Sequence, residues 1–281
     1  MYTQKTFGRE VAGVLLRAVV VILSFLFIMG IIEVSWEQAE LVSDGTCNVA
    51  VMPIEGVIMP FSQYADYPLI TTPKTVRDFV QQAENDSAIK GILFEINSPG
   101  GTPVASEQIS EIIQNTSLET MSLVGDIGTS GGYLVAASAD TVIASAMSDV
   151  GSIGVTMSYL ENTKQNEEDG LTFVEIASGK FKDSGNPNKE LTDDERVLFE
   201  KDLQIVHDEF VRQVADLRNM PVDEVQEIAD GSSIIGSRAL DMGLVDKIGG
   251  RETARKEFAY WLQLNESEVS FCEYYPNQLF F

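Results

Sequence analysis

Two glycine-rich turns contain serines that could take part in acyl transfer. Residues 97–101 read NSPGG and residues 128–133 read GTSGGY, and each turn follows an apolar run and precedes a helical pattern. Glycine permits a tight turn and the close approach of a substrate backbone. A helix that begins at such a turn offers unpaired N–H groups and a partial positive charge, both suited to an oxyanion. Either turn alone is also typical of a purely structural loop.

A nucleophilic serine needs a base. His207 is the only histidine, and it lies within a predicted helix beside Asp208 and Glu209, where a polar position on a solvated face is its expected role. A lysine is the other known base for such a serine. Its pKa of about 10.4 must first be lowered by burial. Lys180 and Lys182 follow an apolar stretch within SGKFKD, although both could be simple loop charges.

The elements that would position these residues alternate between strands and helices. Thr72-Pro73 marks a helix start. The segment TDDE, which begins at Thr192, is a capping box that opens a long helix to about Arg218, with two more helices expected after it. This alternation predicts an α/β fold with largely parallel strands. The predicted strands are residues 49–54, 89–96, 121–127, 141–145 and 171–177.

The N-terminal part of the chain predicts a membrane anchor. Residues 11–32 are apolar except for Arg17, and these 22 residues are long enough to span a bilayer. Basic residues precede the segment and acidic residues follow it, so the positive-inside rule places the N-terminus in the cytoplasm. A cleaved signal peptide is the alternative, but EVSWE follows the apolar run instead of small residues. We therefore expect an anchor over residues 1–35, a stalk over 36–47 and a folded domain over 48–281.

Composition excludes several classes of function. The 281 residues include 19 basic and 43 acidic ones, a formal net charge of -24. Such a surface repels nucleic acid and anionic lipid head groups. Solubility or a salty habitat explains the acidity, and a preference for basic substrates is left open. Cys47 and Cys272 have no CxxC spacing, so no zinc site is expected, and the sequence does not decide whether they pair.

Four motifs in order give the chain a family resemblance. Together they are specific, although none is so alone, and they resemble the signal peptide peptidase A family of Ser/Lys peptidases in its short, single-unit form. The resemblance covers about residues 48–250. Glycine and threonine before Ser130, where small residues such as alanine are commoner, are a mild departure. The motifs are SPGG at 98–101, GTSGGY at 128–133, GSIGV at 151–155 and SGKFKD at 178–183.

The resemblance assigns roles to individual residues. It implies a Clp-protease/crotonase-like fold with an N-terminal transmembrane helix. Ser130 matches the nucleophile, and Lys182 matches the general base because it occupies the GxxK position that Lys180 does not. Ser152 matches a serine that orients the lysine, and the N–H groups of Gly101 and Gly131 match the oxyanion hole. No metal or cofactor is implied.

The resemblance also implies a setting and partners. The expected protein is a single-pass, homo-oligomeric peptidase of the inner (plasma) membrane, with its catalytic domain on the extracytoplasmic, periplasmic side. It would cleave remnant signal peptides and other short or unfolded polypeptides. Lys182 lies in a polar loop without a clear apolar anchor, so we expect a single copy to leave it beyond hydrogen-bond reach of Ser130. A neighbouring subunit would bury or supply the lysine, with the aromatic tail at residues 274–281 as a candidate contact.

Two other functions compete with this one. A crotonase-like acyl-thioester enzyme would also use backbone N–H groups, but it would want basic residues for coenzyme A phosphates, and the chain is acidic. A catalytically inactive membrane scaffold would not need both Ser130 and Lys182. A Clp-type Ser/His/Asp peptidase is excluded because no histidine follows Ser130 before His207. The sequence leaves open the residue preference, the subunit number, the physiological substrate, and whether the dyad lies within one chain.

Overall fold

The computed structural model describes residues 17–24, 45–62 and 69–273. The chain divides into two units, Met1–Leu41 and Val42–Phe281. In the first unit, residues 17–24 are helical. No helix in the described ranges is both long and apolar enough to cross a membrane. Most of the predicted span and stalk, and the whole aromatic tail, lie outside the described residues and stay predictions.

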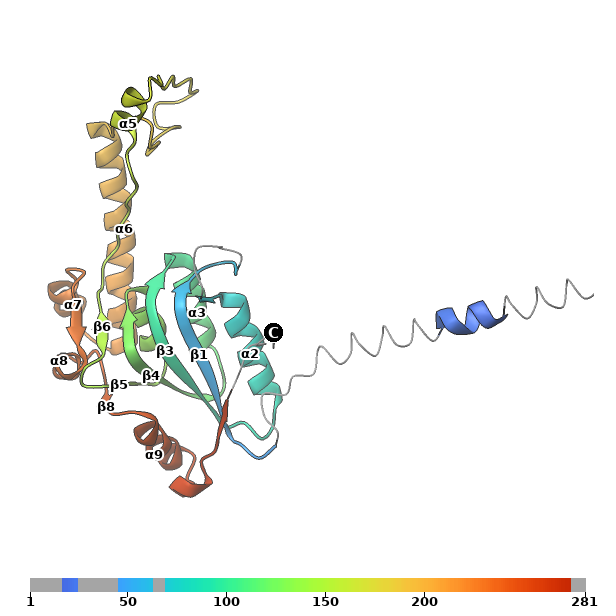
Figure 1. Cartoon of the computed structure of the whole chain (residues 1–281). Helices are drawn as coiled ribbons and strands as arrows, with labels where there is room; N and C mark the ends of the chain where they lie inside the picture. The colour runs from blue at the N-terminus through green and yellow to red at the C-terminus, as the bar shows by residue number, and fades with distance from the viewer. Residues whose placement is uncertain (1–16, 25–44, 63–68, 274–281) are drawn as a thin grey trace, which may run out of the picture. The chain divides into compact units, whose positions relative to one another are not determined.

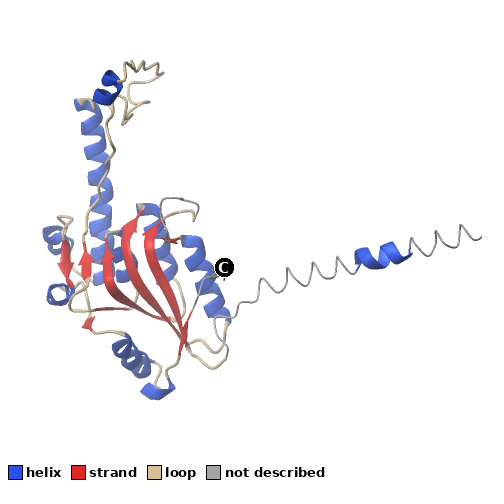
Figure 2. Ribbon diagram, in the orientation of Figure 1, coloured by secondary structure: helices blue, strands red, loops and turns tan. Residues whose placement is uncertain are grey.

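The second unit is built on a β-sheet, which Figure 2 draws in red. The sheet has nine strands, and its main order is β2-β1-β3-β4-β5-β8. Strand β9 pairs with β1, β6 pairs with β4, and among the described strands only β6 and β7 pair antiparallel. The predicted α/β fold with largely parallel strands is therefore confirmed. The strands are β1 Val49–Ile58, β2 Ile70–Thr71, β3 Gly91–Gly101, β4 Glu119–Thr129, β5 Thr141–Ala144, β6 Asp149–Gly151, β7 Ser233–Ile235, β8 Lys247–Ile248 and β9 Phe271–Glu273.

Helices cover both faces of the sheet (Figure 1). Alternate side chains of β1 point to opposite faces: Met52 belongs to the larger core under α2, α3 and α4, while Val51 packs in a second core with Phe258 of α9. The buried faces of the central strands thus explain their continuous apolar runs. The helices are α2 Pro73–Asn85, α3 Pro103–Gln114, α4 Gly131–Ala137, α5 Thr163–Glu168, α6 Asp193–Arg218, α7 Val222–Ile228, α8 Gly236–Asp241, α9 Arg251–Trp261 and the 3-10 turn η1 Glu266–Glu268.

The predicted helix starts are confirmed by their capping contacts. The Thr72 side chain accepts a hydrogen bond from the Thr75 N–H, and Pro73 opens α2. At α6 both bonds of the capping box between Thr192 and Glu195 are present. The buried side chains of α6 lie mainly in its second half, and its first half extends beyond the sheet with α5 beside its start (Figure 1).

The predicted strand over residues 171–177 is wrong. This segment has no regular structure, and every residue in it is exposed. Val174 is 71% exposed and Ile176 is 95% exposed. The alternating apolar pattern is that of a strand, but a strand forms only where a neighbour pairs with its backbone and covers its side chains. The described part of this chain supplies no such neighbour.

A disulfide joins Cys47, just before β1, to Cys272 in β9. It answers the question that the sequence left open. The two strands that it links also pair in parallel, with Val49 opposite Phe271. The bond therefore fixes the end of the domain to its beginning, across 225 residues of sequence.

We expect loss of this disulfide to lower the free energy of unfolding by about 2–5 kcal/mol, because the cross-link restricts the unfolded chain over a long loop. Chemical denaturation of the full chain, with and without reductant, measures the difference. The variant Cys47→Ala/Cys272→Ala is the matched control, and its stability should not respond to reductant. Equal stability of the oxidised and reduced chains would contradict a stabilising role.

Candidate active site

Ser130 occupies the turn between β4 and α4, as predicted. Its backbone has φ 52° and ψ -128°, a conformation that residues with a side chain rarely adopt. Hydrogen bonds hold it there: the Ser130 N–H donates to the Gly151 carbonyl over 2.7 Å, and the Ser130 carbonyl accepts from the N–H groups of Tyr133 and Leu134. Backbone strain of this kind is characteristic of functional positions. It leaves the serine partly exposed at the N-terminus of a buried helix.

The second glycine turn lies directly against the first. A Cβ added at Gly100 would lie 2.7 Å from the amide nitrogen of Gly131 and 3.0 Å from the Cβ of Ser130. A Cβ added at Gly131 would lie 3.4 Å from the amide nitrogen of Gly101. The structure therefore brings together three of the predicted site residues, Ser130, Gly101 and Gly131. Two backbone N–H groups beside one serine are the components of an oxyanion hole.

Ser98 positions this second turn, a role that the sequence analysis missed. Its side chain is fully buried, and its hydroxyl donates to the Gly56 carbonyl over 2.7 Å and accepts from the Gly100 N–H over 3.1 Å. Gly100 has φ 94°, which favours glycine. The detectable signal was a serine two residues before a glycine, the spacing of a side-chain turn.

A pocket of about 350 Å³ opens beside Ser130. Helices α3, α4 and α6 and the segment after β6 supply its walls, which are mostly apolar. Leu134, Val206 and Phe210 are among the apolar groups, while Glu107 and Gln213 are polar. Sequence reasoning did not predict this pocket because its residues come from elements far apart in the chain. A mostly apolar cavity with a few polar groups next to a nucleophile suits one substrate side chain.

Ser152 contacts the turn after α7. Its hydroxyl donates to the Gly231 carbonyl over 2.8 Å, and its N–H donates to the Ser232 carbonyl over 3.1 Å. Like Ser130, it has a positive φ, of 51°. Because its proton is used in the bond to Gly231, the hydroxyl has only acceptor capacity left for another group. It is thus ready to accept a hydrogen bond from an amine.

The loop that contains Lys182 lies at the start of α6. Lys182 is exposed close to Lys180, and Lys180 pairs with Asp194 in the first turn of α6. The part of α6 that lines the pocket begins at Ile205. At about 1.5 Å of rise per residue, the helix between these two points is about 16 Å long. Among the contacts of the described residues, no hydrogen bond joins Lys182 to Ser130, and the Lys182 N–H donates to the Gly179 carbonyl.

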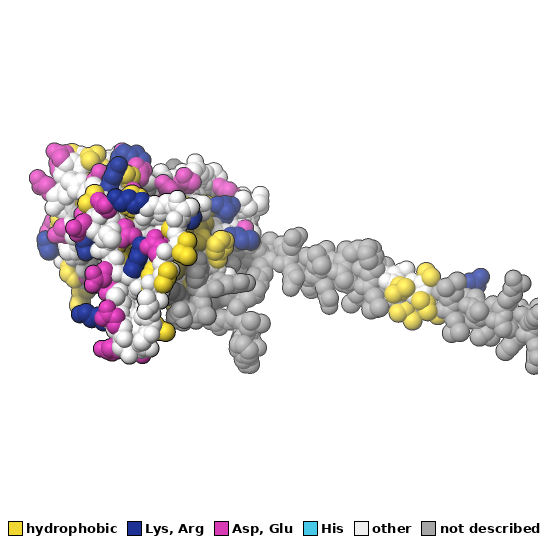
Figure 3. All heavy atoms as spheres, turned by 90° about the horizontal axis from the view of Figure 1, so that it is seen from above, with side chains coloured by type: hydrophobic (Ala, Val, Ile, Leu, Met, Phe, Trp, Pro, Cys, Tyr) yellow, Lys and Arg dark blue, Asp and Glu magenta, His cyan; other side chains and the backbone are white. Residues whose placement is uncertain are grey.

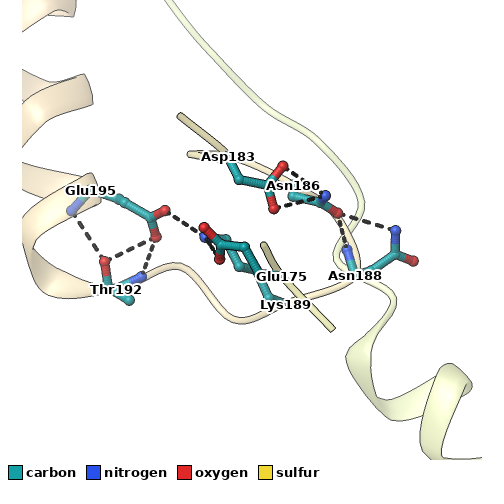
Figure 4. Close-up of polar contacts among 7 residues, drawn as sticks. All are labelled: Glu175, Asp183, Asn186, Asn188, Lys189, Thr192 and Glu195. Carbon is teal, nitrogen blue, oxygen red and sulfur yellow. Dashed lines mark hydrogen bonds and ion pairs between the residues drawn. The ribbon is translucent and has the colours of Figure 1, made fainter. Parts of the chain in front are cut away.

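The three lysines within residues 178–190 differ in their ion pairs. Lys189 pairs with Glu175 over 2.9 Å and with Glu195 over 3.0 Å (Figure 4). The hydrogen bond to Glu175, followed by that to Glu195, raises the pKa of Lys189 to about 12, which makes it a poor base. Lys180 is tied to Asp194. Within the described residues 178–190, Lys182 is the lysine without an ion pair, which favours it as the base.

His207 has a structural contact instead of a solvated position. Its side chain is 17% exposed, and its Nε2 lies 2.9 Å from the Ala229 carbonyl oxygen. The sequence predicted a polar side chain on a solvent-exposed helix face. The structure shows a largely covered side chain, so that prediction is wrong. The reason is that the turn after α7 folds back against α6. The contact ties the ring to that turn.

Gly131→Ala should reduce kcat/KM for peptide hydrolysis by about 10²-fold, because the new Cβ would displace an oxyanion donor. That Cβ would meet the Oγ of Ser106 at 2.2 Å and its Cβ at 2.9 Å. The double variant Gly131→Ala/Ser106→Gly removes both collisions and should recover much of the activity, with Ser106→Gly alone as the control. Steady-state kinetics measure this, and an unimpaired Gly131→Ala would show that the turn does not need glycine.

Comparisons with known proteins point to proteolysis. Residues 114–265, more than half of the chain, match the sequence profile described as "Peptidase family S49". That stretch includes Ser130, Ser152 and Lys182. The chain is also similar to a "Putative protease" of Methanocaldococcus jannaschii, with 31% identity over 68% of this chain and 62% of the relative.

Two further relatives are named for proteolysis. A "Putative signal peptide peptidase SppA" of Enterococcus faecium is 32% identical over 68% of this chain and 56% of its own length. The "Serine protease SPPA, chloroplastic" of Arabidopsis thaliana is 31% identical over 62% of this chain and 26% of its own length. The matched part thus spans less than two thirds of each of these relatives.

Proposed function

The chain belongs to peptidase family S49, and from this premise we propose that it is a membrane-anchored serine endopeptidase that uses a Ser130/Lys182 dyad. Membership confirms the family resemblance carried by the four motifs. The observation that carries the proposal is Ser130 in its strained turn, with the N–H groups of Gly101 and Gly131 beside it. The parallel sheet with its extended glycine turns supports a Clp-protease/crotonase-like fold.

The reaction follows from this geometry. The neutral amine of Lys182 takes the proton of Ser130 as Oγ attacks a peptide carbonyl carbon. The backbone N–H groups of Gly101 and Gly131 hold the oxyanion, and each donor lowers the free energy of the transition state by about 3 kcal/mol. The lysinium then protonates the leaving amine, and water hydrolyses the acyl-enzyme by the same route in reverse.

Ser152 fits the role of orienting the lysine. Its hydroxyl proton is engaged with the Gly231 carbonyl, so the oxygen accepts a hydrogen bond from the lysine amine. When one N–H of the lysine amine donates to the Ser152 hydroxyl, the lone pair of the amine nitrogen is free to face Ser130. The Ser152 N–H is itself fixed by the Ser232 carbonyl, so the hydroxyl does not drift.

Assembly into a homo-oligomer completes the dyad in this proposal. An exposed lysine keeps its proton at neutral pH, so a neighbour must bury it. The segment that contains Lys182 also exposes apolar side chains on an otherwise acidic protein: Leu160 is 85% exposed and Ile176 is 95% exposed. Several large apolar side chains exposed on one segment are typical of an interface. A second copy that covers it would dehydrate the loop around Lys182.

The proposed substrates are remnant signal peptides and other short or unfolded polypeptides. The mostly apolar pocket beside Ser130 suits a side chain from such a segment. A relative named as a signal peptide peptidase points the same way. The competing acyl-thioester function is disfavoured, because no lysine or arginine lines the described pocket to hold coenzyme A phosphates. An inactive scaffold would not require the strain at Ser130.

Labelling with a serine-reactive fluorophosphonate, followed by peptide mapping, tests the proposal directly. The modified residue should be Ser130, and labelling should track hydrolysis of a fluorogenic peptide. Acyl-CoA hydrolysis under the same conditions serves as the competing reaction. Labelling at no serine, with no peptide cleavage by the intact oligomer, would refute the proposed activity.

We place the catalytic domain on the extracytoplasmic side of the inner (plasma) membrane, with the N-terminus in the cytoplasm. The Cys47–Cys272 disulfide supports this, since such bonds persist in oxidising compartments. Protease added to intact spheroplasts should digest the domain, while a cytoplasmic marker protein survives. Immunoblotting follows both. Protection of the domain until lysis would reverse the orientation.

A further inference from the structure

The pocket beside Ser130 contains a carboxylate that no cation neutralises. Glu107 of α3 is half-buried among apolar side chains of the pocket. No lysine or arginine in the described part of the chain pairs with it. Its partner is a neutral amide, the Nε2 of Gln213, which donates to its Oε1 over 3.0 Å. A carboxylate held in place without a counter-charge has acceptor capacity left for a substrate cation.

A second carboxylate at the same amide differs in this respect. Gln213 Nε2 also donates to Glu209 Oε1 over 2.8 Å within α6, while its bond to Glu107 joins α6 to α3. Arg212 neutralises Glu209, with Nε 3.0 Å from Glu209 Oε2. The bond from Gln213 fixes the position of Glu107, while the charge of Glu107 stays uncompensated.

We infer that Glu107 is a specificity-determining residue that makes the pocket favour a lysine or arginine side chain at the residue that Ser130 attacks. This rests on the proposed peptidase function. The aliphatic stem of such a side chain packs against apolar walls such as Leu134 and Phe210, and its charged end reaches Glu107. The net charge of -24 left open a preference for basic substrates. This inference assigns that preference to Glu107 in the pocket.

The test compares two side chains that share the same four-carbon chain. Fluorogenic peptides with lysine or norleucine before the scissile bond differ only in the terminal ammonium. The full-length wild type should cleave the lysine peptide with a kcat/KM about tenfold higher, the size expected for a hydrogen bond to a charged group. Glu107→Gln preserves shape and the contact with Gln213, and it should bring the ratio close to one by lowering cleavage of the lysine peptide alone.

Glu111→Gln is the matched control, because Glu111 is exposed one turn further along α3 and lies outside the pocket. It should keep the wild-type ratio. Equal cleavage of both peptides by the wild type, or an unchanged ratio in Glu107→Gln, would overturn this inference and leave the peptidase function intact. Failure of the wild type to cleave either peptide would instead count against the proposed function.

Discussion

Ser130→Ala is expected to reduce peptide hydrolysis by about 10⁴-fold or more, because the acyl-enzyme can no longer form and only binding and the oxyanion donors remain. The alanine keeps the Cβ of serine in the same backbone conformation, so folding should be unchanged. Activity against a fluorogenic peptide and thermal unfolding of the same preparation measure both. Retention of more than a few per cent of activity would mean that another residue is the nucleophile.

Ser130→Gly is an informative companion variant. Glycine lacks the nucleophile but adopts φ 52° without the steric cost that serine bears. We expect it to be as inactive as the alanine variant and more stable than the wild type by about 1 kcal/mol, the strain stored in the turn. If Ser130→Gly were less stable than the wild type, the serine side chain would stabilise the turn by more than the backbone strain destabilises it.

Lys182→Ala is the second change with a very large expected effect. Lys182→Arg should be equally inactive, because a guanidinium keeps the charge but cannot give up its proton near neutral pH. The wild-type rate should rise with pH into the alkaline range, since the reactive form is the deprotonated amine. Lys180→Ala is the matched control and should remain active. Loss of activity in Lys180→Ala with an active Lys182→Ala would move the base to Lys180.

Mixed oligomers can show whether the dyad spans two subunits. Each of the inactive variants Ser130→Ala and Lys182→Ala retains the group that the other lacks. Co-assembly should restore activity if a neighbour supplies the lysine. No recovery, in a sample shown to contain mixed oligomers, would confine the dyad to one chain. Full activity from a dilute monomer would remove the need for assembly altogether.

Local rules in the sequence predicted the parts of the fold that depend on neighbouring residues. The capping box at Thr192 fixes the start of α6 because both partners lie within one turn. The two glycine turns follow strands and precede helices for the same local reason. The segment 171–177 failed because a strand depends on a partner, which the described chain does not supply. Its alternating pattern alone carries no information about a neighbour.

The candidate site also contains some residues that local sequence rules predict and others that they do not. Ser130, Gly101 and Gly131 could be read from motifs, because each turn carries its own geometry. The pocket could not, since Glu107 and Gln213 are 106 residues apart and meet only when α3 packs near α6. His207 was misplaced for a similar reason, because its contact with Ala229 depends on the return of the chain after α7.

The disulfide bond between Cys47 and Cys272 has a consequence for biosynthesis. Synthesis proceeds from the N-terminus, so β1 emerges long before β9, its parallel neighbour at that edge. Contacts so distant in sequence form late, because a large loop must close first. Oxidation of this pair therefore waits until 225 further residues have been made. A chain that stops before residue 272 retains an unpaired thiol at Cys47, which marks it as unfinished to any thiol-recognising quality control.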